Sequence, residues 1–100
     1  MNKVSIQIVS WNSLKFLPDC LESIFNQSFR DFSVLVIDNC SRDHTPEYLE
    51  RNWPQVKMLK NSRNLGFSRA HNQGILATSG EFVLVLNPDI ILELDFLKHF

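Results

Sequence analysis

Val83-Leu84-Val85-Leu86-Asn87-Pro88-Asp89 is a run of four aliphatic residues that ends in an asparagine, a proline and an aspartate. The aliphatic run predicts a buried strand. Proline has no backbone N–H to donate to a neighbouring strand, so the strand stops there. Asp89 is therefore predicted at the carboxyl edge of its sheet, which is where open α/β sheets bind ligands.

The same periodicities predict three more strands and three helices along the chain. The strands are expected at residues 4–9, 32–37 and 56–59, and the helices at residues 14–27, 45–53 and 67–77. Strands and helices alternate with short connections, which predicts an α/β fold: a Rossmann-like parallel sheet of order 3-2-1-4 with helices on both faces. Residues 94–100 read as the start of another helix, so we expect a truncated domain.

Local signals support these boundaries. Thr45 is expected to cap the second helix, with Pro46 at its first position. Gly80 is expected in the left-handed conformation that ends the third helix. The predicted core includes the following residues: Val4, Ile6, Ile8, Leu35, Ile37, Val83 and Val85.

Composition limits the classes of partner. The 100 residues suit one domain, and 44% hydrophobic residues are enough for one core. A net charge of -1 gives no overall attraction to nucleic acid or to an anionic membrane. Cys20 and Cys40 fit no metal spacing and are expected as free thiols, which favours a cytoplasmic location. No apolar run is long enough to span a bilayer, and peripheral contact with the inner face of the membrane stays open.

Polar clusters follow three of the predicted strands. They are Ser10-Trp11-Asn12, Asp38-Asn39 and Asn87-Pro88-Asp89. Each cluster alone could be an ordinary turn or cap, but all three are expected along one rim of the sheet. Neither glycine-rich nucleotide motif is present. Carboxylates approach a diphosphate through a divalent cation, so the rim indicates a Mg²⁺ or Mn²⁺ site rather than a phosphate-cradling loop.

These clusters, together with residues 36–43, 64–67 and 72–74, resemble the amino-terminal half of a family 2 glycosyltransferase with the GT-A fold. The resemblance covers nearly the whole chain in order and spacing. Asp-Asn after the second strand and Asn-Pro-Asp after the fourth are most similar to the rhamnosyltransferase-like group. The resemblance implies that residues 1–100 are the nucleotide-diphospho-sugar-binding half of that domain.

The resemblance also implies site residues. The nucleotide-binding set is Ser10, Trp11, Asn12, Asp38, Asn39, Asn64, Gly66 and Asn72, and the metal set is Asp89 with Asn87 in a variant of the D-x-D motif. Trp11 either packs on the base or ribose or covers the first helix. Asn39 stands where many family members have a second aspartate. Arg63, Arg69 and His71 either belong to a solvated helix face, which is the expectation, or contact a phosphate.

The implied reaction is metal-assisted transfer of a sugar, with inversion, from a donor such as dTDP-rhamnose or a UDP-sugar to an acceptor hydroxyl. The implied acceptor is a glycan or a lipid-linked glycan of polysaccharide biosynthesis. The catalytic base stays unassigned, because Glu93 and Asp95 follow the metal motif too closely and fit the first turn of a final helix.

Two other readings remain open. The first is a non-catalytic nucleotide-binding or interaction module of the same fold, which forms a homo-oligomer through apolar surface near the fourth strand. The second is a receiver-like or flavodoxin-like signalling domain, for which acidic residues at strand ends are also natural. Lys60-Asn61-Ser62 at the end of the third strand argues against a receiver, which places an acidic residue there.

Overall fold

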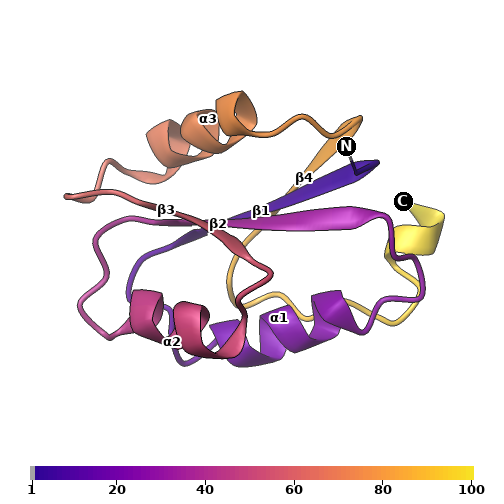
Figure 1. The fold of residues 1–100 in the computed structure, drawn as a ribbon, viewed down its shortest axis with the longest axis horizontal. Coiled ribbons are helices and arrows are strands. Elements are labelled where there is room, and N and C mark those ends of the chain that lie inside the picture. Colours follow the sequence, from indigo (N-terminus) through magenta and orange to yellow (C-terminus); the bar gives the residue numbers. More distant parts are fainter. Residues whose placement is uncertain (1) are drawn as a thin grey trace.

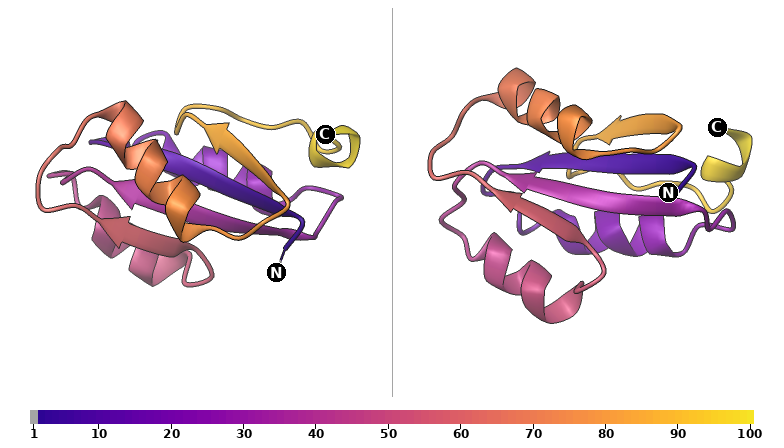
Figure 2. Two further views of the ribbon diagram at one scale, coloured as in Figure 1. Left: turned by 90° about the horizontal axis from the view of Figure 1, so that it is seen from above. Right: turned by 45° about the horizontal axis from the view of Figure 1, so that its top comes forward.

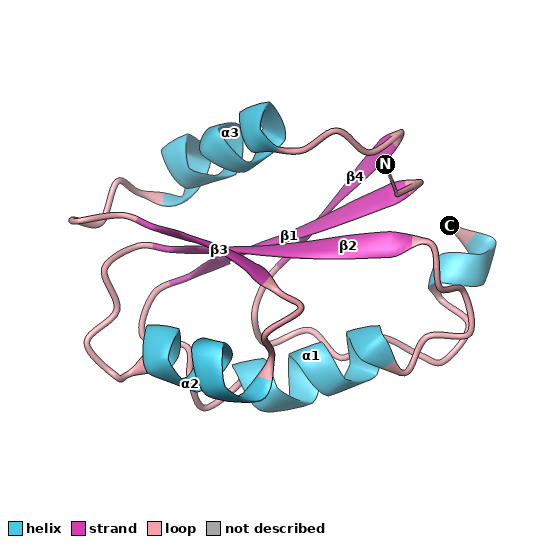
Figure 3. Ribbon diagram, viewed as in Figure 1, coloured by secondary structure: helices cyan, strands magenta, loops and turns pink. Residues whose placement is uncertain are grey.

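The computed structural model describes residues 2–100. Its elements are β1 (Val4–Ser10), α1 (Leu17–Phe25), β2 (Phe32–Asp38), α2 (Thr45–Asn52), β3 (Lys57–Lys60), α3 (Phe67–Ala77), β4 (Phe82–Leu86) and a 3-10 turn, η1 (Leu97–His99). The four strands form one parallel sheet in the order β3-β2-β1-β4, which confirms the predicted topology (Figures 1 and 3).

Helices cover both faces of the sheet, as predicted. Figure 1 shows α3 on one face, and α1 and α2 on the other. Apolar residues of α1 and α2 pack with Val4, Ile6 and Ile8 of β1 in the larger core, whereas Ala70 of α3 packs with Val9 of β1 in a smaller one. Every residue of β1 is buried, because this strand has a neighbour on each side and a helix layer on each face.

The predicted burial of Val83 and Val85 is wrong. Val83 is only half-buried and Val85 is 42% exposed. The register places both residues on the same face as Ser5 and Gln7 of β1, which is the face that α3 covers. However, α3 packs mainly over β1 and β2, so this face of the edge strand β4 is left open (Figure 2).

Several element ends differ from the predicted ones. The segment before α1 first makes a turn, in which the carbonyl of Ser13 accepts bonds from Phe16 and Leu17, so the helix begins at Leu17. Thr45 is the first residue of α2, and the preceding residue, His44, is in the left-handed conformation. At the far end of the chain, the expected helix is limited to η1.

Gly80 does not cap α3 in the left-handed conformation. The helix ends at Ala77, and the next residue, Thr78, has an extended backbone. Gly66 is the one glycine with positive φ among residues 2–100. Position 80 instead requires glycine because there is no room for a side chain: a Cβ atom there would collide with the side chain of Ser5. The third helix itself has the predicted bounds.

The segment that follows β4 is fixed against α1. Gln27 is 1% exposed, and its Nε2 donates to the Glu93 carbonyl at 2.6 Å while its Oε1 accepts from the Leu97 N–H at 2.9 Å. The Leu92 N–H donates to Ser23 Oγ at 3.0 Å. These bonds hold the chain on the carboxyl side of Asn-Pro-Asp. Among residues 2–100, none of the helices is both long enough and apolar enough to cross a membrane.

Candidate functional site

A pocket of about 310 Å³ opens at the carboxyl ends of the strands. It is lined by Val9, Trp11, Ser13, Asn39, Asn64, Gly66, Phe67, Asn87 and Pro88. Val9 belongs to β1 and Phe67 begins α3, and the other lining residues come from the loops after β1, β2, β3 and β4. Figure 1 shows the loops after β2 and β3 leaving the same end of the sheet. Five of the residues predicted to bind the nucleotide or the metal therefore share one pocket: Trp11, Asn39, Asn64, Gly66 and Asn87.

Two aromatic side chains border this pocket. Trp11 is 55% exposed and Phe67, the first residue of α3, is 57% exposed. The Phe67 ring meets the His71 ring edge to face, with 4.3 Å between the ring centroids. The exposure of Trp11 favours its role as a pocket wall over its alternative role as a cover for α1.

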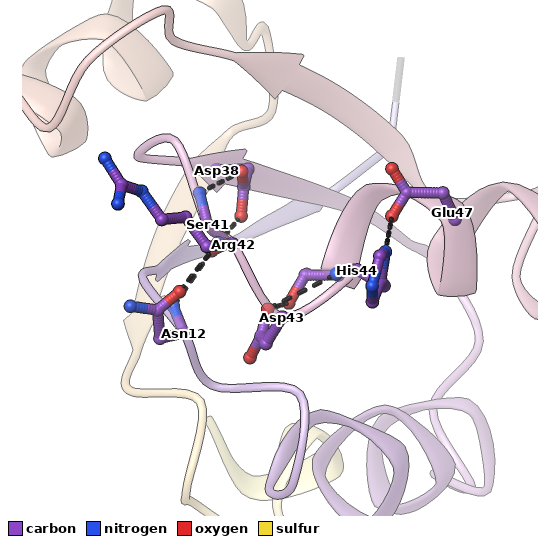
Figure 4. A network of polar contacts seen from close by, with 8 residues as sticks. Asn12, Asp38, Ser41, Arg42, Asp43, His44 and Glu47 are labelled. Carbon is purple, nitrogen blue, oxygen red and sulfur yellow. Dashed lines mark hydrogen bonds and ion pairs between the residues drawn. The ribbon is translucent and has the colours of Figure 1, made fainter.

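The loops after β1 and β2 are joined by hydrogen bonds (Figure 4). The Asn12 N–H donates to Ser41 Oγ at 2.9 Å, and the Arg42 N–H donates to Asn12 Oδ1 at 2.8 Å. Asn12 has a φ of 51°, a conformation that asparagine tolerates better than most residues. The predicted cluster at the end of β1 is therefore held in place by the loop after β2.

Asp38 is 2% exposed, and its carboxylate organises the loop that follows β2. Its Oδ1 accepts from Ser41 Oγ at 2.6 Å and its Oδ2 accepts from the Ser41 N–H at 3.0 Å (Figure 4). Each carboxylate oxygen has a second lone pair, so Asp38 keeps acceptor capacity. Ser10 is fully buried, and its Oγ has no hydrogen-bond partner within residues 2–100.

The sequence analysis missed Asp43, which completes this loop. Its Oδ1 accepts from the Thr45 Oγ1 and N–H, and its Oδ2 accepts from the Leu14 N–H at 2.9 Å. Burial alone raises the pKa of Asp43, but the bonds from Thr45 and Leu14 outweigh it, so the pKa lies below its usual value. The signal in the sequence was Asp-x-Thr-Pro ahead of a helix.

Asn87-Pro88-Asp89 forms a turn in which the Ile90 N–H donates to the Asn87 carbonyl at 3.1 Å. Asn87 and Asp89 are both exposed. Burial and then the negative charge of Asp89 raise the pKa of the Cys20 thiol to about 11, so Cys20 is protonated and inert at neutral pH. Cys20 and Cys40 are both free thiols, as predicted.

The residues of this turn do not form a metal site by themselves. Residues 2–100 hold no group of three or more His, Cys, Asp or Glu side chains placed to bind a metal ion. Mg²⁺ is commonly held by one or two carboxylates plus substrate phosphates, and the exposed Asp89 with the Asn87 amide oxygen matches that donor set.

The remaining predicted residues lie on and before α3. Arg63 and Arg69 are exposed, as predicted, whereas the prediction for His71 is wrong because this side chain is only 6% exposed. Gln7 Nε2 lies 2.8 Å from His71 Nδ1 and 3.0 Å from the His71 carbonyl. The Gln7 amide therefore donates to both, and the neutral ring carries its proton on Nε2. Asn72 is exposed and is not among the pocket-lining residues.

Comparison with known proteins identifies the family. Residues 5–100 match the family described as Glycosyl transferase family 2. The chain is 30% identical over 106 residues to the dolichyl N-acetyl-alpha-D-glucosaminyl phosphate 3-beta-D-2,3-diacetamido-2,3-dideoxy-beta-D-glucuronosyltransferase of Methanococcus voltae, covering 99% of this chain and 33% of that protein. It is 32% identical over 103 residues to the poly(ribitol-phosphate) beta-N-acetylglucosaminyltransferase TarS of Staphylococcus aureus, covering 98% of this chain and 18% of TarS. The chain thus spans about a third or less of the length of these relatives.

Solved structures agree with this result. Residues 1–349 of Staphylococcus aureus TarS in complex with UDP-GlcNAc superpose with a TM-score of 0.89 at 31% identity, over 97% of this chain and 29% of that one. The mannosyltransferase PcManGT from Pyrobaculum calidifontis, in complex with GDP-Man and Mn²⁺, shares the fold, with a TM-score of 0.83 at 22% identity over 90% of this chain and 28% of that one. The parallel sheet of order 3-2-1-4 is thus that of the GT-A glycosyltransferases, and the chain belongs to glycosyl transferase family 2.

Proposed function

We propose that this protein transfers a sugar from a nucleotide-diphospho-sugar donor to an acceptor hydroxyl, and that residues 2–100 form its donor half-site. The observation that carries the proposal is the single pocket that joins Trp11, Asn39, Asn64, Gly66 and Asn87 at the carboxyl ends of the strands. This is the position at which open α/β sheets bind ligands. Family membership supports the reaction class.

The donor we infer is a pyrimidine diphospho-sugar, either a UDP-sugar or dTDP-rhamnose. The TarS fragment at 31% identity binds UDP-GlcNAc, which supports a uridine base. The Asp38-Asn39 and Asn87-Pro88-Asp89 variants support the rhamnosyltransferase-like group. UDP and dTDP differ by the 5-methyl group of the base and by the ribose 2′-hydroxyl, so direct comparison of the two nucleotides distinguishes the alternatives.

The chemistry is displacement at the anomeric carbon with inversion, in which the acceptor hydroxyl attacks and the nucleoside diphosphate leaves. Asp89 and the Asn87 amide would hold a divalent cation, which supplies positive charge opposite the leaving diphosphate. Trp11 offers an aromatic surface to the base or ribose, and Asp38 an acceptor to the same groups. The resemblance to the family supports donor contacts from Asn12, Asn64 and Asn72, of which Asn64 lines the pocket.

No base is assigned within residues 2–100. Asp95 Oδ1 accepts from Ser28 Oγ, just after the end of α1, and the Glu93 carbonyl is bound by Gln27. Both residues are exposed and neither lines the pocket. We assign proton removal and most acceptor contacts to residues outside this range. The proposed acceptor is a glycan or lipid-linked glycan, met at the cytoplasmic face of the membrane.

The test is a transfer and binding assay on the complete encoded protein. UDP or dTDP is expected to bind in the presence of Mn²⁺, and radiolabelled sugar from the matching donor is expected in a glycan or lipid fraction. Binding without transfer or donor hydrolysis would favour the non-catalytic nucleotide-binding module. Absence of binding to any nucleoside diphosphate would contradict both functions.

A further inference from the structure

The side-chain amide of Asn39 lies at the border of the donor pocket, yet its polar atoms are already bonded to the protein. Asn39 is 2% exposed. Its Nδ2 donates to the Gly66 carbonyl at 3.2 Å, and its Oδ1 accepts from Asn61 Nδ2 at 2.9 Å and from the Leu65 N–H at 3.4 Å. These bonds leave the side chain little capacity to bind a nucleotide directly.

A second pair of amides extends the network to α3. Asn61 and Gln73 bond reciprocally, with Asn61 Nδ2 donating to Gln73 Oε1 and Gln73 Nε2 donating to Asn61 Oδ1, both at 2.9 Å. The Asn61 N–H also donates to the Asp38 carbonyl at 2.9 Å. Three uncharged amides therefore tie the end of β2 to the loop before α3 and to the helix itself.

The part of the pocket wall that this network holds is the start of α3. Gly66 has a φ of 85°, and its N–H donates to Asn64 Oδ1 at 2.8 Å. Asn64, Gly66 and Phe67 all line the pocket. Asn39, which directly follows β2, is bonded to this wall at both ends of its amide, through the Gly66 carbonyl and the Leu65 N–H.

We propose that Asn39 is a positioning residue, which places the Asn64–Phe67 wall of the donor pocket and does not itself read the nucleobase. The inference rests on the proposed function and deepens it. The amide is required because one end must donate to Gly66 while the other end accepts from Asn61. A carboxylate in its place would set an oxygen against the Gly66 carbonyl oxygen and leave a buried charge without a donor on that side.

The test is Asn39→Asp, which keeps the shape of the side chain and removes the donor. The dissociation constants of UDP, dTDP, CDP and GDP in Mn²⁺ are measured by calorimetry from pH 8 to pH 5. At pH 8 we expect the variant to bind all four more weakly by the same factor, about tenfold. As the pH falls, the carboxyl takes up a proton and can again donate to Gly66, so the ratio of variant to wild-type dissociation constants is expected to fall towards 1.

Matched variants separate positioning from contact. Gln73→Leu breaks the α3 side of the network, and Gln73 does not line the pocket. This variant is also expected to bind all four nucleotides more weakly. Its effect should not add to that of Asn39→Asp in the double variant. Asn52→Asp makes the same chemical change at an exposed residue of α2. It is expected to leave the dissociation constants of all four nucleotides unchanged at every pH.

The alternatives give different results. If Asn39 contacts the base, Asn39→Asp will change the order of preference among the nucleotides and Gln73→Leu will leave binding intact, which overturns the proposal. A ratio that does not change with pH overturns it as well. If the wild type binds no nucleoside diphosphate, the proposed function fails. The positioning role of Asn39 is then tested by amide hydrogen exchange. Exchange at residues 64–67 must be faster in Asn39→Asp at pH 8 than in the wild type.

Discussion

Asp43 Oδ2 accepts a hydrogen bond from the backbone N–H of Leu14 at 2.9 Å, which joins the loop after β2 to the loop after β1. The two residues are 29 positions apart in the sequence. Together with the bonds between Asn12 and the Ser41-Arg42 pair, this contact fixes the loop that carries Trp11 and the loop that follows Asp38 (Figure 4). The proposed donor half-site therefore depends on a carboxylate that need not touch the donor.

Asp43→Ala is expected to lower the free energy of unfolding by about 1 to 3 kcal/mol, because the N–H groups of Leu14 and Thr45 lose their acceptor. Urea denaturation at pH 7 measures this loss. Glu47→Ala is the control, since Glu47 makes an exposed ion pair with His44 at 3.5 Å and is expected to contribute little. Equal effects of the two substitutions would contradict the role given to Asp43.

The Asp43 carboxylate is also expected to make the stability of the fold depend on pH in the acid range. The folded-state pKa of Asp43 is below its ordinary value of 3.8, so its contribution to stability is complete above 3.8 and is lost as the pH falls towards the folded-state value. Wild-type stability should therefore fall more steeply below pH 4 than that of Asp43→Ala. Parallel curves for the two proteins in that range would be evidence against the assignment.

His71 predicts a separate pH dependence at higher pH. Burial lowers the pKa of His71 below its ordinary value of 6.5, so the unfolded chain takes up a proton before the folded one does. The free energy of unfolding is therefore expected to fall as the pH drops from 6.5 towards the folded-state pKa. Above pH 6.5, His71 is expected to make no pH-dependent contribution to it. His71→Asn, which keeps an acceptor near the place of Nδ1, should show a flatter curve.

The control for this experiment is His44→Asn, because the His44 side chain is 86% exposed. Unfolding in urea between pH 5 and pH 8 compares the three proteins. If His71→Asn retains the slope of the wild type, another group is responsible for it.

The sequence was sufficient to predict the sheet order and the position of α3, because hydrophobic periodicity and short connections leave few parallel topologies. It was also sufficient to place Trp11, Asn39 and Asn87 on one rim, since parallel strands end at the same edge. These features depend on local pattern and on general rules of chain connection.

The errors concern contacts between distant parts of the chain. Val85 has the pattern of a buried strand residue, but its exposure depends on how far α3 extends over the sheet. His71 has the spacing of a solvated helix face, but its partner Gln7 is 64 residues away. The bond from Asp43 to Leu14 is similarly absent from any local pattern. Periodicity reports the environment of a segment, and it does not identify the side chain that a polar group will meet.

Cys40 gives a prediction about backbone strain. Its φ is 64°, in the left-handed region that glycine occupies without steric cost. Cys40→Gly is expected to be more stable than Cys40→Ala by about 0.5 to 1 kcal/mol, because alanine keeps the steric penalty and only glycine removes it. Thermal denaturation of both variants measures the difference. Greater stability of the alanine variant would show that the backbone is relaxed at this position.

Aromatic side chains near β4 predict self-association of these 100 residues. The Phe100 ring lies 6.2 Å from Phe82 and 6.3 Å from Phe96 between centroids, and all three side chains are more than 40% exposed. Light scattering at several concentrations should show a mass above that of a monomer, and Phe100→Glu should reduce it. Leu76→Ser removes an 88% exposed apolar side chain on α3 and should not affect the mass. A monomer at every concentration would contradict this prediction.

The most direct test of the donor site is calorimetric titration of the complete protein with UDP and dTDP, in Mn²⁺ and in chelator. The wild type is expected to bind at least about tenfold more tightly with Mn²⁺, a difference of about 1.4 kcal/mol. Asp89→Asn should bind with the same weak affinity in both conditions, because the amide keeps the shape and loses the charge that balances the cation. Asp31→Asn, at an exposed carboxylate before β2 and thus at the other end of the sheet, should behave as the wild type does. If the wild type binds equally well in metal and in chelator, and Asp89→Asn changes neither affinity nor sugar transfer, then Asn87-Pro88-Asp89 is a strand-ending turn and the metal-assisted donor site is wrong.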